Sequence, residues 1–228
     1  MFIDNMSGLE LLNEYKADLQ EIKVDAQEFD ASRRMNDLIR KNKKKKEFTA
    51  VKTSVSKRGN KYLGILIYTR EGIRTWRWRS YHIGLMNTKK GLMALAFFAD
   101  DNVTVKYTPH FFRRYKERML ESNIDWTLRN ELIKADTLKK IVLVYIKRNL
   151  GTVWVETGAV YKEKNHIVAP THDGVTLLQW SNTLKVYQAN TFVTYNMLSD
   201  KQREMLKKLS DGQLDGKTGT SPGSVSAN

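Results

Sequence analysis

The sequence predicts an α+β protein in which antiparallel β meanders pack against helices and a helical arm comes first. Three observations carry this prediction. Apolar residues recur at three- and four-residue steps over 9–22, which is typical of an amphipathic helix. From residue 48 the period changes to two, as in half-buried strands. A second helical region, 109–148, then separates the first strand-rich region, 48–107, from another at 152–196.

The arm, residues 1–46, is predicted to hold two helices of opposite charge. Ser7 and Glu10 have the spacing of a capping box, so the first helix begins there. Its apolar stripe needs a partner, which is either the rest of the chain or a second copy of it. Eight acidic residues fall within 1–30, and eight basic ones follow within 33–46. The acidic helix can pair with the basic one and screen it until a stronger anion displaces it.

Turn residues divide the first strand-rich region into about five strands. Three of the connections have clear turn residues, which are Arg58-Gly59-Asn60, Glu71-Gly72 and Asp100-Asp101-Asn102. Thr108-Pro109 marks a helix start, because threonine caps helices and proline is favoured at the first helical position. Two more helices are expected at 125–134 and 138–148. The β-branched residues of the latter also fit a buried strand.

The second meander is divided by turns into short strands, followed by a closing helix. We expect these strands at 153–161, 166–169, 175–180, 184–188 and 191–195. Ser199 and Gln202 cap the closing helix. Residues 47–210 then form one α+β domain if the two meanders share a sheet. The remaining 211–228, rich in Gly, Ser and Thr, is predicted to be a disordered tail.

Composition limits the function classes. Thirty-nine basic residues against 25 acidic ones leave a net charge of +14 in 228 residues, which attracts phosphate backbones or anionic lipid. The plainer alternative is that this charge only keeps the protein soluble. The absence of cysteine excludes a disulfide scaffold and thiol chemistry. No signal peptide, membrane span, metal-ligand set or nucleotide-loop motif is visible, so we expect a cytoplasmic protein without cofactor, metal or membrane association.

The most specific group of residues lies at the start of the helix after Thr108. His110, Arg114 and Arg118 are spaced by four, so they form one stripe along the helix, beside an apolar face. A neutral imidazole can act as a base, and two guanidinium groups can bind a phosphate. Alternatively, His110 only caps or packs, and the arginines form solvated pairs such as that of Arg113 with Glu117.

This segment resembles the helix of the barnase/RelE-like superfamily of metal-independent RNase toxins. One branch of that family carries a His-x-x-x-Arg-x-x-x-Arg helix after a Ser/Thr-x-His start, with an antiparallel sheet following. Thr108, His110, Arg114 and Arg118 match this pattern, and the resemblance covers about 103–196.

The resemblance implies that RNA is cleaved through the ribose 2′-hydroxyl without a metal. His110 would transfer the proton, and Arg114 and Arg118 would hold the phosphate. Thr194 and Tyr195 would contribute from the closing strand. In such a toxin-like protein the substrate is RNA.

A strand rich in tryptophan and arginine supplies a second candidate site. Trp76, Trp78 and His82 should point to one face, and Arg77, Arg79 and Tyr81 to the other. Either this strand is a stacking platform for single-stranded nucleic acid, or the tryptophans are core and the arginines face solvent. The nucleic-acid contacts that we predict are Lys43, Lys44, Lys45, Lys46, Trp76, Arg77, Trp78, Arg79, Arg113 and Lys116.

Three functional hypotheses follow. The first is a nucleic-acid-directed protein, with RNA favoured, that acts as a metal-independent endoribonuclease. The second is a non-catalytic nucleic-acid-binding protein, for example of a phage or mobile element, that uses the Trp/Arg strand and the lysine run. The third is a structural or assembly protein that forms a homo-oligomer through its N-terminal amphipathic helix.

Overall fold

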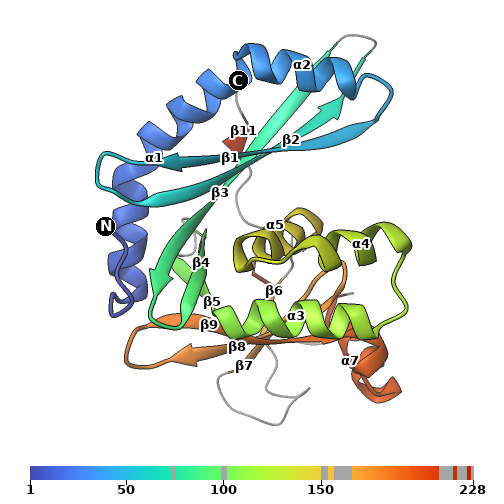
Figure 1. Ribbon diagram of the computed structural model, residues 1–228. Coiled ribbons are helices and arrows are strands. Elements are labelled where there is room, and N and C mark those ends of the chain that lie inside the picture. Colours follow the sequence, from blue (N-terminus) through green and yellow to red (C-terminus); the bar gives the residue numbers. More distant parts are fainter. Residues whose placement is uncertain are drawn as a thin grey trace.

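A computed structural model of the chain describes residues 1–72, 75–98, 102–149, 154–156, 166–210, 218–219 and 225–226. It has an α+β fold in which helices lie on both sides of a mostly antiparallel sheet, with a helical arm at the N-terminus (Figure 1). The predicted fold class is therefore confirmed. None of the described helices is long and apolar enough to cross a bilayer.

The helices begin where the sequence predicts. They are α1 (Gly8–Asp30), α2 (Arg33–Lys41), α3 (Pro109–Glu121), α4 (Trp126–Lys134), α5 (Leu138–Asn149) and α7 (Asp200–Ser210), with a short 3-10 helix, η1 (Tyr195–Met197). The capping box of α1 is present, because Glu10 N donates to Ser7 Oγ at 3.3 Å and Ser7 N donates to the Glu10 carboxylate at 2.7 Å. Thr108 Oγ1 caps α3 by accepting from Phe111 N at 3.2 Å. The segment that also fitted a buried strand is the helix α5.

The strands form one sheet. They are β1 (Glu47–Val55), β2 (Lys61–Arg70), β3 (Trp76–Thr88), β4 (Gly91–Phe98), β5 (Val103–Tyr107), β6 (Trp154–Glu156), β7 (His166–Pro170), β8 (Gly174–Ser181), β9 (Val186–Thr194), β10 (Thr218–Gly219) and β11 (Val225–Ser226). Their order is β1-β2-β3-β4-β5-β9-β8-β7-β6-β10, and β11 pairs with β3. Neighbours are antiparallel except β5 and β9.

The parallel pairing of β5 with β9 joins the two meanders. Val105 lies opposite Tyr187, and Tyr107 lies opposite Ala189. Two details differ from the expectation. The predicted strands 184–188 and 191–195 are a single strand, β9, because no turn interrupts the pairing with β8. Most of the predicted strand 153–161 and of the tail 211–228 lies outside the described residues.

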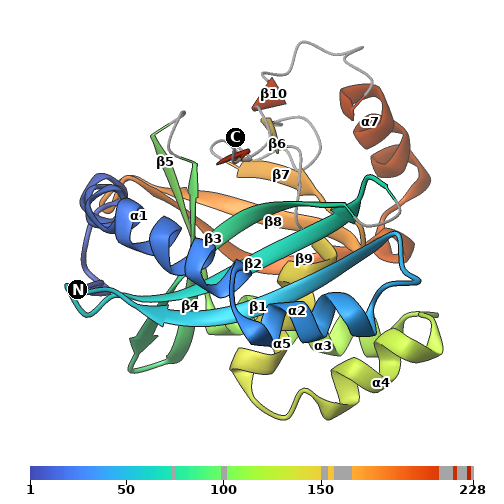
Figure 2. The same ribbon diagram turned by 90° about the horizontal axis from the view of Figure 1, so that it is seen from above.

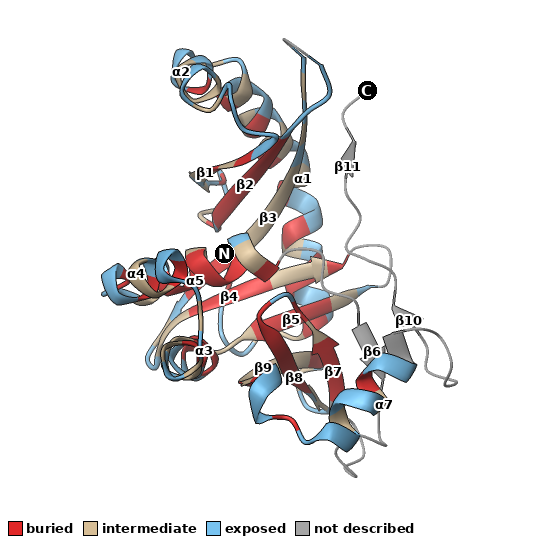
Figure 3. Ribbon diagram, turned by 90° about the vertical axis from the view of Figure 1, so that its right-hand side faces the viewer, coloured by how far each residue is buried: buried red, intermediate tan, exposed pale blue. Residues whose placement is uncertain are grey.

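The sheet separates two helical layers, as Figures 1 and 2 show. Successive residues of β2 point to opposite faces, and most of this strand is buried (Figure 3). Tyr62 packs with residues of α1, whereas Leu63 joins the larger core beneath α3 and α5. The centre of that core is aromatic, with the ring of Tyr115 5.0 Å from those of both Tyr145 and Phe192.

The apolar stripe of α1 is covered by the protein's own sheet. Leu11, Leu12, Tyr15 and Ile22 are buried against the first meander. Tyr15 stacks on Phe97 with ring centroids 4.4 Å apart. Most of this stripe is thus covered by the rest of the chain, whereas Leu9 stays 59% exposed.

Candidate nucleic-acid interface and the cleft beside His110

Exposed cations gather at one end of the sheet, which we call the basic end. It comprises α2, the linker 42–46, and the adjoining ends of β1, β2 and β3, at the upper right of Figure 1. The linker is fastened to β2, because the Arg70 guanidinium donates to Lys43 O at 2.8 Å and Arg70 N donates to Lys46 O at 2.9 Å. The exposed cations of this end are Arg33, Arg34, Arg40, Lys41, Lys43, Lys44, Lys45, Lys46, Arg70, Arg77 and Arg79.

Few acidic groups oppose these cations. Asp37 pairs with Arg40, and Glu71 pairs with Arg77 at 3.4 Å, both on the protein surface. None of the ammonium groups of Lys43–Lys46 forms an ion pair with a described residue. These two carboxylates offset only two of the cations, so the basic end keeps a positive net charge.

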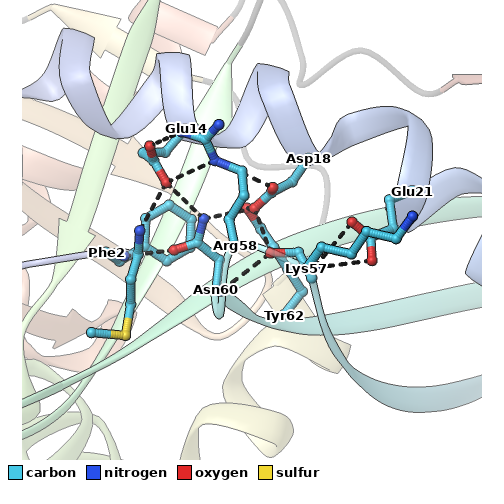
Figure 4. A network of polar contacts seen from close by, with 10 residues as sticks. Phe2, Glu14, Asp18, Glu21, Lys57, Arg58, Asn60 and Tyr62 are labelled. Carbon is cyan, nitrogen blue, oxygen red and sulfur yellow. Dashed lines mark hydrogen bonds and ion pairs between the residues drawn. The ribbon is translucent and has the colours of Figure 1, made fainter.

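The acidic residues of α1 are engaged elsewhere, contrary to the expectation that they screen the basic run. Asp25 pairs with Lys52 of β1, and Glu14 pairs with Arg58 in the β1–β2 turn. Glu21 accepts hydrogen bonds from Lys57 N at 3.0 and 3.1 Å (Figure 4). The reason is geometric, because α1 runs across the first strands instead of doubling back along α2.

Asp18 is the buried centre of this network (Figure 4). Its side chain is only 1% exposed, and its Oδ2 accepts from Asn60 Nδ2 at 2.6 Å, Tyr62 OH at 2.7 Å and Ser56 Oγ at 2.9 Å. Hydrogen bonds from Arg58 and Asn60 lower the pKa of neighbouring Glu14 to about 2. The network holds α1 on the β1–β2 turn and is a structural feature.

The Trp/Arg strand alternates as predicted. Trp76 and Trp78 are half-buried and pack in the cluster beneath α2, where Trp76 meets Phe48 edge-on at 5.1 Å. Arg77 and Arg79 are exposed on the other face. The tryptophans therefore pack against the core cluster on one face of the strand, and the arginines add charge to the basic end from the other face.

The His110 stripe does not converge on one point. His110 is exposed, whereas Arg114 pairs with Glu117 at 3.1 Å. Arg118 is half-buried and donates to Phe192 O and, at 3.4 Å, to Thr191 Oγ1. A straight helix lying along a strand explains this, because residues four apart reach successive parts of β9 and not a shared ligand.

The predicted contributors from the sheet lie at the far end of β9. Thr108 N, at the start of α3, donates to Ala189 O at 3.2 Å. Thr194 comes five residues later, roughly 17 Å along an extended strand. Thr194 is buried, and Tyr195 OH donates to Thr171 O at 2.6 Å. The structure therefore does not bring either residue to His110.

The remaining predicted contacts on α3 divide between two roles. Lys116 Nζ donates to Ala135 O at 2.8 Å and so fastens α3 to the segment between α4 and α5. Arg113 is exposed and lines a cleft of about 940 Å³ that also borders His110. Asp4 and Lys90 line the same cleft. Sequence reasoning missed these two residues because they lie far from α3 along the chain.

Among the residues placed by the structure, no group of three or more His, Asp or Glu side chains could hold a metal ion.

Comparison of the chain with protein-family models, curated proteins and solved structures finds no significant match in any of the three. The functional argument therefore depends on the geometry and charge of the chain itself.

Proposed function

We propose that the protein binds nucleic acid through the basic end, with RNA favoured by the resemblance of α3 to the RNase toxins. The observation that supports this most is the run Lys43–Lys46, four exposed ammonium groups without an ion pair among the described residues. Arg77 and Arg79 add positive charge to the same end of the sheet, on the face opposite α2. Such a surface gains affinity for a phosphate backbone by releasing condensed counterions.

The test is a titration of labelled single-stranded RNA and of duplex DNA with the protein and two variants. One variant replaces Lys43–Lys46 by alanine. The control replaces Lys57, Lys61, Lys89 and Lys201, which are exposed outside the basic end, so both variants lose four charges. We expect at least a tenfold loss of affinity in the first variant, because its lysines would contact phosphates directly. The control should change little, because its lysines lie outside the interface. Equal losses would show that only net charge matters and would refute a defined interface.

A second candidate function is a metal-independent endoribonuclease that uses His110. The observation that favours it is the position of this histidine, exposed at the edge of a cleft and not buried in the core. A base must reach the 2′-hydroxyl of a bound ribose, and an exposed imidazole beside a cleft meets that requirement.

This second proposal is tested by incubating labelled RNA in EDTA with the wild type and His110→Ala. Cleavage by the wild type alone would support His110 as the proton-transfer group. Binding without cleavage, equal in the two proteins, would refute the catalytic proposal and leave the nucleic-acid-binding one.

A further inference from the structure

The cleft beside His110 is built from segments that only the fold brings together. Its walls are the chain before α1, the β3–β4 turn, the first turn of α3, and the β8–β9 turn with the start of β9. Figure 1 shows these segments at the lower left, at the other end of the molecule from the basic end. The cleft is thus a separate site from the proposed nucleic-acid interface.

Tertiary hydrogen bonds hold the walls in place. Gly8 N donates to Leu184 O at 2.7 Å, which ties the start of α1 to the β8–β9 turn. Lys106, only 1% exposed, donates from Nζ to Asp4 O at 2.7 Å and to Met6 O at 3.2 Å. Because these contacts exist in the free protein, the cleft is preformed and a ligand need not order it.

The charge of the cleft favours an anion. Lys90 and Arg113 are exposed, and neither forms an ion pair within the part of the chain that the structure describes. Asp4 is the acidic residue of the lining. Unpaired guanidinium and ammonium groups are the side chains best suited to hold a phosphate.

The rest of the lining suits a ligand larger than phosphate. A volume of about 940 Å³ is far more than a bare anion fills. Met93 and Leu184 supply apolar contacts, while the amides of Gln188 and Asn190 can both donate to and accept from a base edge. We propose that this cleft binds a phosphate-bearing nucleotide, with Lys90 and Arg113 on the phosphate and Gln188 and Asn190 on the base. The inference takes its ligand class from the proposed function, but it assigns a different site.

The experiment is calorimetric titration of the full chain with adenosine 5′-monophosphate, adenosine and inorganic phosphate. We expect the monophosphate to bind more tightly than either part alone. The double variant K90A/R113A should lose roughly tenfold or more in affinity for it, because two charge-assisted contacts disappear. The control is K57A/K201A, which removes two exposed cations that lie outside both the cleft lining and the basic end.

Three results would overturn the assignment. The first is that the monophosphate does not bind, and the second is equal affinity of the wild type and K90A/R113A for it. The third is equally tight binding of inorganic phosphate, which would show an anion site without nucleotide recognition. The alanine variant of Lys43–Lys46 separates this inference from the proposed function. This variant should bind the monophosphate with the affinity of the wild type, even if its affinity for RNA is reduced.

Discussion

His82 lies on β3 with its Nε2 atom buried and, within the described part of the chain, without a hydrogen-bond partner. Burial, helped by the charge of Lys23 and opposed by that of Asp25, lowers the pKa of His82 to about 4. Asp25 is itself paired with Lys52 of β1. A positive charge on this imidazole would therefore have no dedicated acceptor in the interface between α1 and the sheet.

We expect His82 to make the free energy of unfolding decrease as the pH is lowered. Between pH 6.5 and pH 4 the unfolded chain protonates His82 and the folded chain does not, so the free energy of unfolding decreases as the pH falls. The full effect is on the order of 3 kcal/mol. Urea unfolding of the wild type and His82→Gln at pH 7, 5.5 and 4.5 measures it, since the variant should lack this slope. Glu14, whose pKa is lowered to about 2, loses its contribution below pH 4.5 in both proteins. Parallel pH profiles would contradict the assignment.

Among the secondary-structure elements, α1 meets the β8–β9 turn so closely that its first residue has to be glycine. A Cβ atom on Gly8 would overlap the carbonyl oxygen of Lys185, which is backbone and cannot rotate away. We expect Gly8→Ala to lower the free energy of unfolding by about 1–3 kcal/mol, although alanine is the better helix former. Chemical denaturation measures this, with Gln20→Ala at an exposed position of α1 as the control. An unchanged or higher stability of Gly8→Ala would show that the turn moves freely.

A second element-scale contact joins α3 and α5 to the turn before β8. The buried Asp173 carboxylate accepts from Tyr115 OH at 2.6 Å, from Arg148 at 2.7–3.0 Å and from Asn149 Nδ2 at 3.1 Å. Burial alone would raise the pKa of Asp173, but the hydrogen bonds from Arg148 and Tyr115 outweigh it and the pKa is lowered.

Asp173→Asn should lower the free energy of unfolding by about 2–4 kcal/mol, because Arg148 keeps its charge and loses its counter-charge. Thermal or denaturant unfolding measures the loss, and Asp136→Asn, which removes an exposed pair with Lys140, serves as the matched control. If the two substitutions cost the same, the network does not hold α3 and α5 on the turn.

On the scale of the whole molecule, the separation of the basic end from the His110 cleft determines how affinity should depend on salt. For single-stranded RNA, the slope of log K against log salt is about −0.7 for each phosphate contact. The alanine variant of Lys43–Lys46 should therefore have a slope that is shallower by up to about 3. The K90A/R113A variant should leave more of the slope in place, since it keeps the four lysines. Anisotropy titrations over a range of salt concentrations compare the three proteins, and identical slopes would refute electrostatic binding at the basic end.

The sequence by itself determined the local features. These features follow from residues within a few positions of one another. They are the helix starts at Ser7 and Thr108, the alternation of Trp76 and Arg77, and the exposed lysine run. Capping and strand periodicity act over such short distances, so they can be predicted without knowing the fold.

Only the tertiary structure decided which groups meet. Three contacts join residues about 20 to 110 positions apart. They are the parallel pairing of β5 with β9, the engagement of the α1 carboxylates by the β1–β2 turn, and the shared cleft of Asp4, Lys90 and Arg113. The same contacts direct Arg118 to β9 and so separate it from His110. Spacing along a helix determines which side chains share a face, but the surface packed against that face determines what each of them can bind.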